Sequence, residues 1–190
     1  MKAGSVRIIG GKWRSRKLKV HAVEGLRPTP DRVRETVFNW LAAYIPGAYC
    51  LDLFAGTGAL GFEALSRGAQ YVEMVDKSPQ VIKLLKEQLH LLAGEDAMVN
   101  ASIYQAIVPN TINTPTHPFD IVFLDPPYKE KLLFSTCLYL EEKNFLADIA
   151  YIYLEADAQI KDNELPNRWK LIKAKQNGQV FYHLAKREKE

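Results

Sequence analysis

The chain has 190 residues, 47% of them hydrophobic and 25% charged, with a net charge of +3. These ordinary globular values exclude intrinsic disorder, and the length suits one compact domain. Apolar runs fall short of the roughly 18 residues of a membrane helix, and the basic N-terminus lacks the apolar segment of a signal peptide, so we expect a cytoplasmic protein without a membrane segment.

The first elements lie in a strongly basic part of the chain. Residues 1–34 carry ten basic and two acidic side chains, a net charge of +8, whereas residues 35–190 carry −5. Val6–Ile9 and Lys12–Val20 predict a β-hairpin with a turn at Gly10-Gly11, and we treat residues 1–26 as a basic arm. Such an arm is typical of binding to a polyanion, although a solvated, charged N-terminus explains the same count.

A helix should follow the arm. Thr29-Pro30-Asp31 predicts its start, with Thr29 as the N-cap and Pro30 at the first helical position. Its apolar face would consist of Val33, Val37, Trp40, Leu41 and Tyr44. This helix opens the main domain, which we place at residues 27–186, ahead of a charged tail at residues 187–190.

From about residue 47, short apolar runs alternate with helical patterns. Strands are predicted at Tyr49–Phe54, Tyr71–Val75, Met98–Ile103, Phe119–Leu124 and Ala150–Leu154, and helices at Ala59–Arg67, Pro79–Leu92 and Leu132–Leu140. This alternation predicts an α/β fold with a parallel sheet and helices on both faces. Trp169–Ala174 and Gln179–Ala185 flank an Asn-Gly turn signal, so the mostly parallel, seven-stranded sheet should end in an antiparallel hairpin.

The cysteines and histidines indicate no special chemistry. Cys50 and Cys137 lie in apolar runs, and two such residues fit buried thiols in a reducing compartment better than a disulfide scaffold. The two cysteines and four histidines show no spacing typical of metal ligands, so we expect no metal. Nothing in the sequence suggests more than a monomer.

A glycine-rich loop follows the first strand of the main domain. Gly56, Gly58 and Gly61 match G-x-G-x-x-G, and Asp76 ends the next strand. This pattern is typical of a nucleotide-type ligand whose ribose hydroxyls hydrogen-bond to the acid, although a purely structural glycine turn is the alternative. Asp52 precedes the loop, where a carboxylate would repel a pyrophosphate, so it favours S-adenosylmethionine over a dinucleotide.

A second motif, Asp-Pro-Pro-Tyr at residues 125–128, follows a buried strand. Ligands of open parallel sheets bind at the carboxyl ends of the strands, so Asp125 should face the glycine loop across a cleft. A Pro-Pro turn with a helix-capping Asp125 is the alternative. As a catalytic group, the motif offers acceptors at the Asp125 carboxylate and the Pro126 carbonyl, a chain fixed by Pro127, and an aromatic ring at Tyr128.

Together these motifs resemble those of amino-group methyltransferases that use S-adenosylmethionine. The segments at residues 7–18, 27–41, 62–69 and 178–182 narrow the resemblance to the bacterial RsmD family, the 16S ribosomal RNA guanine-N2 methyltransferases. The resemblance covers nearly the whole chain and implies a Rossmann-like class I methyltransferase fold. It also implies 16S rRNA, or the small ribosomal subunit, as the partner.

The resemblance implies roles for particular residues. The base amine would lie against Asp125, Pro126, Pro127 and Tyr128, with Tyr128 stacking on a flipped base. Ser102 or the Ile103 amide would contact the adenine of the cofactor, because no acid is available after the third strand. The cofactor-binding set is Asp52, Phe54, Ala55, Gly56, Thr57, Gly58, Asp76, Lys77, Ser102, Ile103 and Thr29. The RNA-binding set is Lys12, Arg14, Arg16, Lys17, Lys19, Arg32 and Arg34, with Lys12, Arg14 and Arg16 on one strand face.

Three other functions stay open. A DNA adenine-N6 methyltransferase shares Asp-Pro-Pro-Tyr, but it generally carries a target-recognition segment, whereas only short loops separate the elements here. A non-catalytic RNA-binding assembly module of the same fold would not need intact Asp125 and Tyr128. A NAD-dependent oxidoreductase fits the glycine loop, but Asp52 and Asp-Pro-Pro-Tyr count against it. Trp13, beside the arm's basic residues, is interpreted as a core anchor rather than a base stacker.

Overall fold

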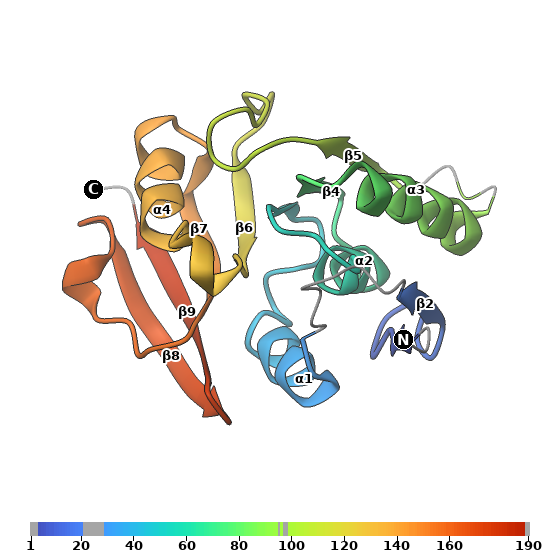
Figure 1. The fold of residues 1–190 in the computed structure, drawn as a ribbon, viewed down its shortest axis with the longest axis horizontal. Coiled ribbons are helices and arrows are strands. Elements are labelled where there is room, and N and C mark those ends of the chain that lie inside the picture. The colour runs from blue at the N-terminus through green and yellow to red at the C-terminus, as the bar shows by residue number, and fades with distance from the viewer. Residues whose placement is uncertain (1–3, 21–28, 95, 97–98, 189–190) are drawn as a thin grey trace.

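A seven-stranded sheet forms the centre of the molecule in the computed structural model, which describes residues 4–20, 29–94, 96 and 99–188 (Figure 1). The strand order is β5-β4-β3-β6-β7-β9-β8, in which the first five strands are parallel and β9 pairs antiparallel with both β7 and β8. Their bounds are β3 Tyr49–Asp52, β4 Tyr71–Asp76, β5 Ala101–Gln105, β6 Phe119–Leu124, β7 Leu146–Ala156, β8 Trp169–Asn177 and β9 Val180–Glu188. The predicted fold class is confirmed.

Helices cover both faces of the sheet, as predicted. On one face lie α1 (Asp31–Trp40), α2 (Ala59–Ser66) and α3 (Pro79–Ala93), which share a core with Cys50, Ile121 and Tyr182. On the other lies α4 (Leu133–Glu142), which packs Cys137 and Leu140 against the sheet. Two short 3-10 turns, η1 (Tyr128–Glu130) and η2 (Asp162–Glu164), complete the elements. Both cysteines are free and buried, as expected.

The N-terminal hairpin differs from its prediction at the turn. β1 (Gly4–Arg7) pairs antiparallel with β2 (Lys17–Val20), so residues 8–16 form a long connection instead of a two-glycine turn. Gly10 and Gly11 lie in this connection, close to the end of α2. Glycine is needed there because a Cβ on Gly11 would lie 1.8 Å from the Ser66 carbonyl oxygen. Lys12 and Arg14 consequently lie in turns and Arg16 directly precedes β2, so the three share no strand face. Residues 21–28, with most of the arm's junction to α1, lie outside the described residues.

The C-terminal hairpin is longer than predicted. β8 and β9 are joined by Gly178-Gln179, and Gly178 has a φ of +63°, the backbone conformation that its position in the tight turn favours. β9 continues to Glu188, into the stretch expected as a charged tail, because Arg187 is buried and its guanidinium binds the Glu141 carboxylate. Within the described residues, no helix is long and apolar enough to span a bilayer.

Candidate active site

Four acidic side chains lie at the carboxyl ends of adjacent parallel strands. Asp52 ends β3, Asp76 ends β4, Asp125 directly follows β6, and Glu155 is the penultimate residue of β7. Because these strands run in the same direction, all four acids lie at one edge of the sheet, where α/β folds bind ligands. The Asp52 and Asp76 charges interact, as do those of Asp52 and Asp125, so the predicted cofactor and catalytic residues share one site.

The glycine loop is held directly against Asp76. The Gly56 amide donates to one oxygen of this carboxylate at 3.0 Å, and the Ser78 amide donates to the other at 2.8 Å. Gly56 and Gly58 have φ angles of +50° and +74°, so both occupy the left-handed region that favours glycine. Asp76 therefore has a fixed orientation, and each of its oxygens keeps acceptor capacity for a ligand hydroxyl.

Asp52 is a buried carboxyl group beneath the same loop. It is 2% exposed and accepts from the Gly61 amide at 3.0 Å. Its pKa is raised to about 7, chiefly by burial; the Gly61 hydrogen bond opposes this rise and the nearby Asp76 charge adds to it. Gly61 is required for packing, since a Cβ there would lie 2.6 Å from the Met74 sulfur. Gly61, the third glycine of the motif, thus allows α2 to pack closely against the sheet.

Asp125 and Glu155 form a coupled carboxyl pair. Burial, the Glu155 charge and a hydrogen bond between the two carboxyl groups raise the pKa of Asp125 well above its usual range. Tyr128 and Tyr153 each donate a phenolic hydrogen bond to a different Glu155 oxygen, both at 2.8 Å. Thr29 donates to Asp125 at 3.4 Å. The Glu155 charge therefore disfavours the ionised form of Asp125.

Glu155 is not among the site residues predicted from the sequence. It is 6% exposed and lies in a run that reads as an ordinary buried strand, Tyr-Ile-Tyr-Leu-Glu-Ala at residues 151–156. The available signal was the acid at the carboxyl end of the strand, the same feature that identified Asp52 and Asp76. A buried acid with two tyrosine donors is a positioned group, and it belongs to the candidate site.

The predicted adenine contacts Ser102 and Ile103 are displaced from the binding edge. β5 ends at Gln105, not at residue 103, and Ser102 pairs with Glu73, three residues before Asp76. Residues 97–98, where the predicted strand began, lie outside the described residues. Gln105 instead aligns with Asp76, and Ile107, two residues further on, is 60% exposed. Ser102 and Ile103 therefore lie three and two residues before the end of β5, and their contact with the adenine stays a prediction.

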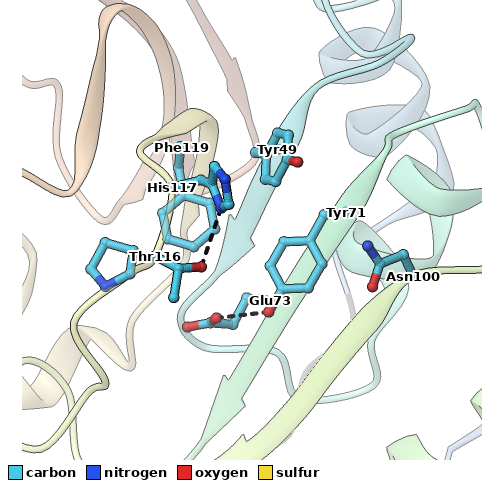
Figure 2. A pocket seen from close by; sticks show the side chains of 8 residues that line it. Tyr49, Tyr71, Glu73, Asn100, Thr116, His117 and Phe119 are labelled. Carbon is cyan, nitrogen blue, oxygen red and sulfur yellow. Dashed lines mark hydrogen bonds between the residues drawn. The ribbon is translucent and has the colours of Figure 1, made fainter.

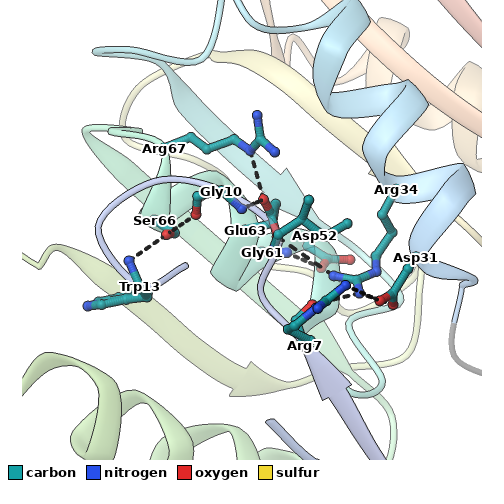
Figure 3. Close-up of polar contacts among 11 residues, drawn as sticks. Arg7, Gly10, Trp13, Asp31, Arg34, Asp52, Gly61, Glu63, Ser66 and Arg67 are labelled. Carbon is teal, nitrogen blue, oxygen red and sulfur yellow. Dashed lines mark hydrogen bonds and ion pairs between the residues drawn. The ribbon is translucent and has the colours of Figure 1, made fainter. Parts of the chain in front are cut away.

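Thr29 is not the predicted N-cap, and Arg34 does not lie at the surface. α1 begins at Asp31 with Pro30 as its N-cap and without a side-chain cap, because the Thr29 hydroxyl binds Asp125. Arg34 is fully buried; its guanidinium donates to Asp31 and to the Arg7 carbonyl, both at 2.7 Å, as Figure 3 shows. A fully buried guanidinium presents no surface to RNA, so the prediction of Arg34 as an RNA contact is wrong.

Two basic residues of the arm bind the C-terminal side of α3. Arg16 donates to the Leu91 and Leu92 carbonyl oxygens at 2.7 and 3.3 Å, and Lys12 pairs with Asp96 at 2.9 Å. The C-terminal end of α3 is its end away from Asp76, so these cations lie far from the glycine loop. The Arg16 contacts satisfy free carbonyls at the helix end. Trp13 is 5% exposed, as expected for a core anchor.

The remaining predicted residues surround the site or stay on the surface. Lys77 follows Asp76 and pairs with Glu130, which lies just beyond Asp-Pro-Pro-Tyr. Phe54, Ala55 and Thr57 lie in the glycine loop, and Pro126 and Pro127 follow Asp125. The surface cations are Arg14, Lys17, Lys19 and Arg32, all exposed. In the described part of the chain, no group of three or more His, Cys, Asp and Glu side chains is arranged to hold a metal ion.

A separate pocket lies at the amino-terminal edge of the sheet. Figure 2 shows Tyr49 and Tyr71, the first residues of β3 and β4, with Glu73 and with His117 from the segment before β6. Its volume is about 250 Å³. Since Asp76 and Asp125 lie at the opposite strand ends, this pocket is not the candidate active site.

Comparisons with known proteins identify the family. The family model described as "Conserved hypothetical protein 95" matches residues 6–186. The ribosomal RNA small subunit methyltransferase D of Escherichia coli (strain K12) is 46% identical over 98% of this chain and 92% of its own length. The chain belongs to the RsmD family. The RsmD relative from Haemophilus influenzae is also 46% identical, over 95% of this chain and 93% of its own length.

The RsmD fold is also matched by a solved structure. The Escherichia coli protein yhhF, described as a methyltransferase, has a TM-score of 0.85 and 44% sequence identity, and covers 98% of this chain and 100% of its own. The sheet order, the N-terminal hairpin and the antiparallel C-terminal strands therefore belong to a methyltransferase fold.

Proposed function

We propose that this RsmD-family chain transfers a methyl group from S-adenosylmethionine to the N2 amine of a guanine in 16S rRNA. The observation that carries the proposal is the group of acids Asp52, Asp76, Asp125 and Glu155 at one sheet edge around a glycine loop. A cationic ligand lowers the cost of placing these charges together, whereas a pyrophosphate raises it. The acids thus support S-adenosylmethionine, which carries a sulfonium and an ammonium, over a dinucleotide.

The protein groups fit the parts of this cofactor. Asp76, fixed by the Gly56 and Ser78 amides, has the acceptors that two ribose hydroxyls need. Asp52 supplies negative charge beneath the loop, directly or through water. The exposed Ile107 lies beyond the end of β5, where it offers an apolar surface to an adenine ring. When bound, the cofactor supplies a methyl group on an activated sulfur leaving group.

The second motif presents acceptors to the base amine. An exocyclic amine is a weak nucleophile because its lone pair is delocalised into the ring. The Asp125 carboxylate and the Pro126 carbonyl accept its two N–H groups and favour a tetrahedral nitrogen. Glu155 and Thr29 fix the orientation of Asp125, and Tyr128 provides a ring for stacking beside them. Positioning of the nitrogen in line with the methyl group supplies most of the rate enhancement.

A methylation assay tests this function. The full chain is incubated with radiolabelled S-adenosylmethionine and, separately, with naked 16S rRNA, with small subunits that lack the modification, and with duplex DNA. We expect label in N2-methylguanine of one of the two RNA substrates. The two RNA arms also distinguish free rRNA from the assembled particle as the substrate.

The other outcomes identify the alternative functions. Label in DNA adenine would overturn the proposal and identify the protein as a DNA methyltransferase. Binding to rRNA without transfer would leave a non-catalytic assembly module. Binding of NAD but not of S-adenosylmethionine, measured by calorimetry, would overturn the assignment of the cofactor.

A further inference from the structure

Three lysines lie on one face of the edge strand β8. Lys170, Lys173 and Lys175 pair with Lys186, Leu184 and Tyr182 of β9, which alternate along that strand and so point to the same face. By simple alternation Lys170 and Lys173 would point to opposite faces. The irregularity between Leu171 and Lys173 takes up one extra residue, so the bulge brings all three lysines onto one face.

This lysine face adjoins the active site. Tyr182 pairs with Glu155 on one side and with Lys175 on the other, so the three residues form one row across β7, β9 and β8. Two strand spacings of about 4.8 Å place the Cα atom of Lys175 about 10 Å from that of Glu155. Figure 1 shows the tip of this hairpin extending past the end of β6, the strand that leads to Asp125.

The hairpin carries mostly positive charge, and its one acidic side chain, Glu188, is the last residue of β9. Residues 169–187 contain five basic and no acidic side chains. Lys170, Lys173 and Lys175 are exposed, and among the described residues none of the three is in an ion pair. By contrast, the arm's Lys12 and Arg16 bind acceptors near the far end of α3. The exposed lysines of β8 therefore remain available to a ligand, and Lys175 lies in the same row as Glu155 of the carboxyl pair.

We propose that the lysine face of β8, formed by Lys170, Lys173 and Lys175, binds the phosphate backbone of the RNA beside the target base. Lysine ammonium groups neutralise phosphates without reading sequence, so this face positions the strand while Asp-Pro-Pro-Tyr takes the base. The inference rests on the proposed function, because it places the RNA of that reaction along β8 and not along the N-terminal arm.

A charge-neutral triple variant tests the inference. Lys170→Gln, Lys173→Gln and Lys175→Gln are combined, and 16S rRNA binding is measured as a function of salt concentration. Each lost phosphate contact reduces the log–log salt slope by about 0.7 to 0.9, so we expect a slope smaller by about 2 to 3. At 0.1 M salt, relative to 1 M, this corresponds to roughly 100- to 500-fold weaker binding. KM for RNA should rise, with kcat unchanged at saturating RNA.

Two further triple variants serve as comparisons. Lys83→Gln, Lys86→Gln and Lys143→Gln make the same charge change at exposed positions on α3 and after α4, and should leave the slope at the wild-type value. Arg14→Gln, Lys17→Gln and Lys19→Gln neutralise the exposed cations of the arm. A wild-type slope in the β8 variant, or an equal loss in the α3 and α4 variant, would overturn the inference. A reduced slope in the arm variant alone would also overturn it and assign the RNA to the arm.

The assay separates this inference from the proposed function. If wild-type protein binds 16S rRNA with a slope that depends on β8 but transfers no methyl group, the reaction is wrong and the binding surface stands. If it methylates rRNA and the β8 variant has the wild-type slope and KM, the reaction stands and the surface is wrong. Thermal unfolding and S-adenosylmethionine binding of each variant verify that the fold is intact.

Discussion

At the scale of single residues, the carboxyl pair of Asp125 and Glu155 determines how the site responds to pH. The pair is buried and hydrogen-bonded, so ionisation of Asp125 is suppressed by its neighbour. A carboxyl group that must accept a hydrogen bond from a base amine works best ionised. Substitutions of Asp125 and of Glu155 can measure how ionisation of Asp125 affects turnover.

Replacement of Asp125 should separate cofactor binding from turnover. Asp125→Ala removes the acceptor at the base amine, and we expect kcat to fall about 100- to 1,000-fold, as for other positioned hydrogen-bonding groups in active sites. S-adenosylmethionine affinity, measured by calorimetry, should stay within about twofold, because Asp76 and the glycine loop are unchanged. Asp125→Asn keeps one acceptor and should retain more activity. Near wild-type turnover of Asp125→Ala would refute the assigned role.

Replacement of Glu155 should shift the pH dependence of the reaction. Glu155→Gln removes a charge that raises the pKa of Asp125, so that pKa should fall. The acidic limb of the kcat/KM profile, where Asp125 becomes protonated, should therefore move to lower pH. Glu142→Gln, at an exposed position near the end of α4, makes the same charge change and should leave the limb in place. If the acidic limb lies at the same pH in the wild type, Glu155→Gln and Glu142→Gln, Glu155 does not act on the ionisation of Asp125.

At the scale of elements, the hydrophobic periodicity of the sequence correctly predicted the strands of the sheet. All seven strands and the C-terminal hairpin were found, because their apolar faces and the Asn-Gly signal are local. The end of β5 was misplaced since Tyr104 and Gln105 are polar residues that pair with β4. Thr29 was mistaken for a helix cap because its partner, Asp125, lies far along the chain. Long-range polar contacts of this kind leave no local pattern.

The attachment of the N-terminal hairpin depends on Glu63 of α2. This fully buried carboxylate accepts the Ile9 and Gly10 amides, each at 2.7 Å, and the Arg67 side chain at 2.7 Å, and lies 3.7 Å from the Arg34 guanidinium (Figure 3). It therefore connects the hairpin, α1 and α2. Deletion of residues 1–20 would remove the buried side chains of Ile8, Trp13 and Leu18 from the core and expose the apolar residues that they cover, so it is not a clean test of RNA binding.

Replacement of Glu63 should destabilise the protein. Glu63→Ala leaves the Arg34 charge buried with one partner fewer. We therefore expect the free energy of unfolding, measured by chemical denaturation, to fall by about 3 to 5 kcal/mol. Hydrogen exchange at the Ile9 and Gly10 amides should become faster. Glu63→Gln keeps an acceptor for the amides and should lose less stability than Glu63→Ala. Equal stability of Glu63→Ala and the wild type would show that the hairpin is held by its apolar contacts alone.

At the scale of the whole molecule, Asp52 makes stability depend on pH. Its pKa rises from 3.8 to about 7 on burial, so the folded state binds this proton more tightly than the unfolded state. The contribution to stability is fully present below about pH 4 and is lost as the pH rises through 7. Asp52→Asn should therefore raise the denaturation midpoint at pH 8 more than at pH 5. An equal change at both values would show that Asp52 stays ionised in the folded protein.

The position of β8 at the edge of the sheet has a consequence for solubility. An edge strand has unpaired amide and carbonyl groups that can pair with another copy of the chain, and such pairing begins aggregation. Lysines and bulges are the features that protect natural edges, and β8 has both, with three lysines and one irregularity. The positive charge along β8 thus also keeps copies of the chain apart, and neutralised variants need analysis by sedimentation at several concentrations.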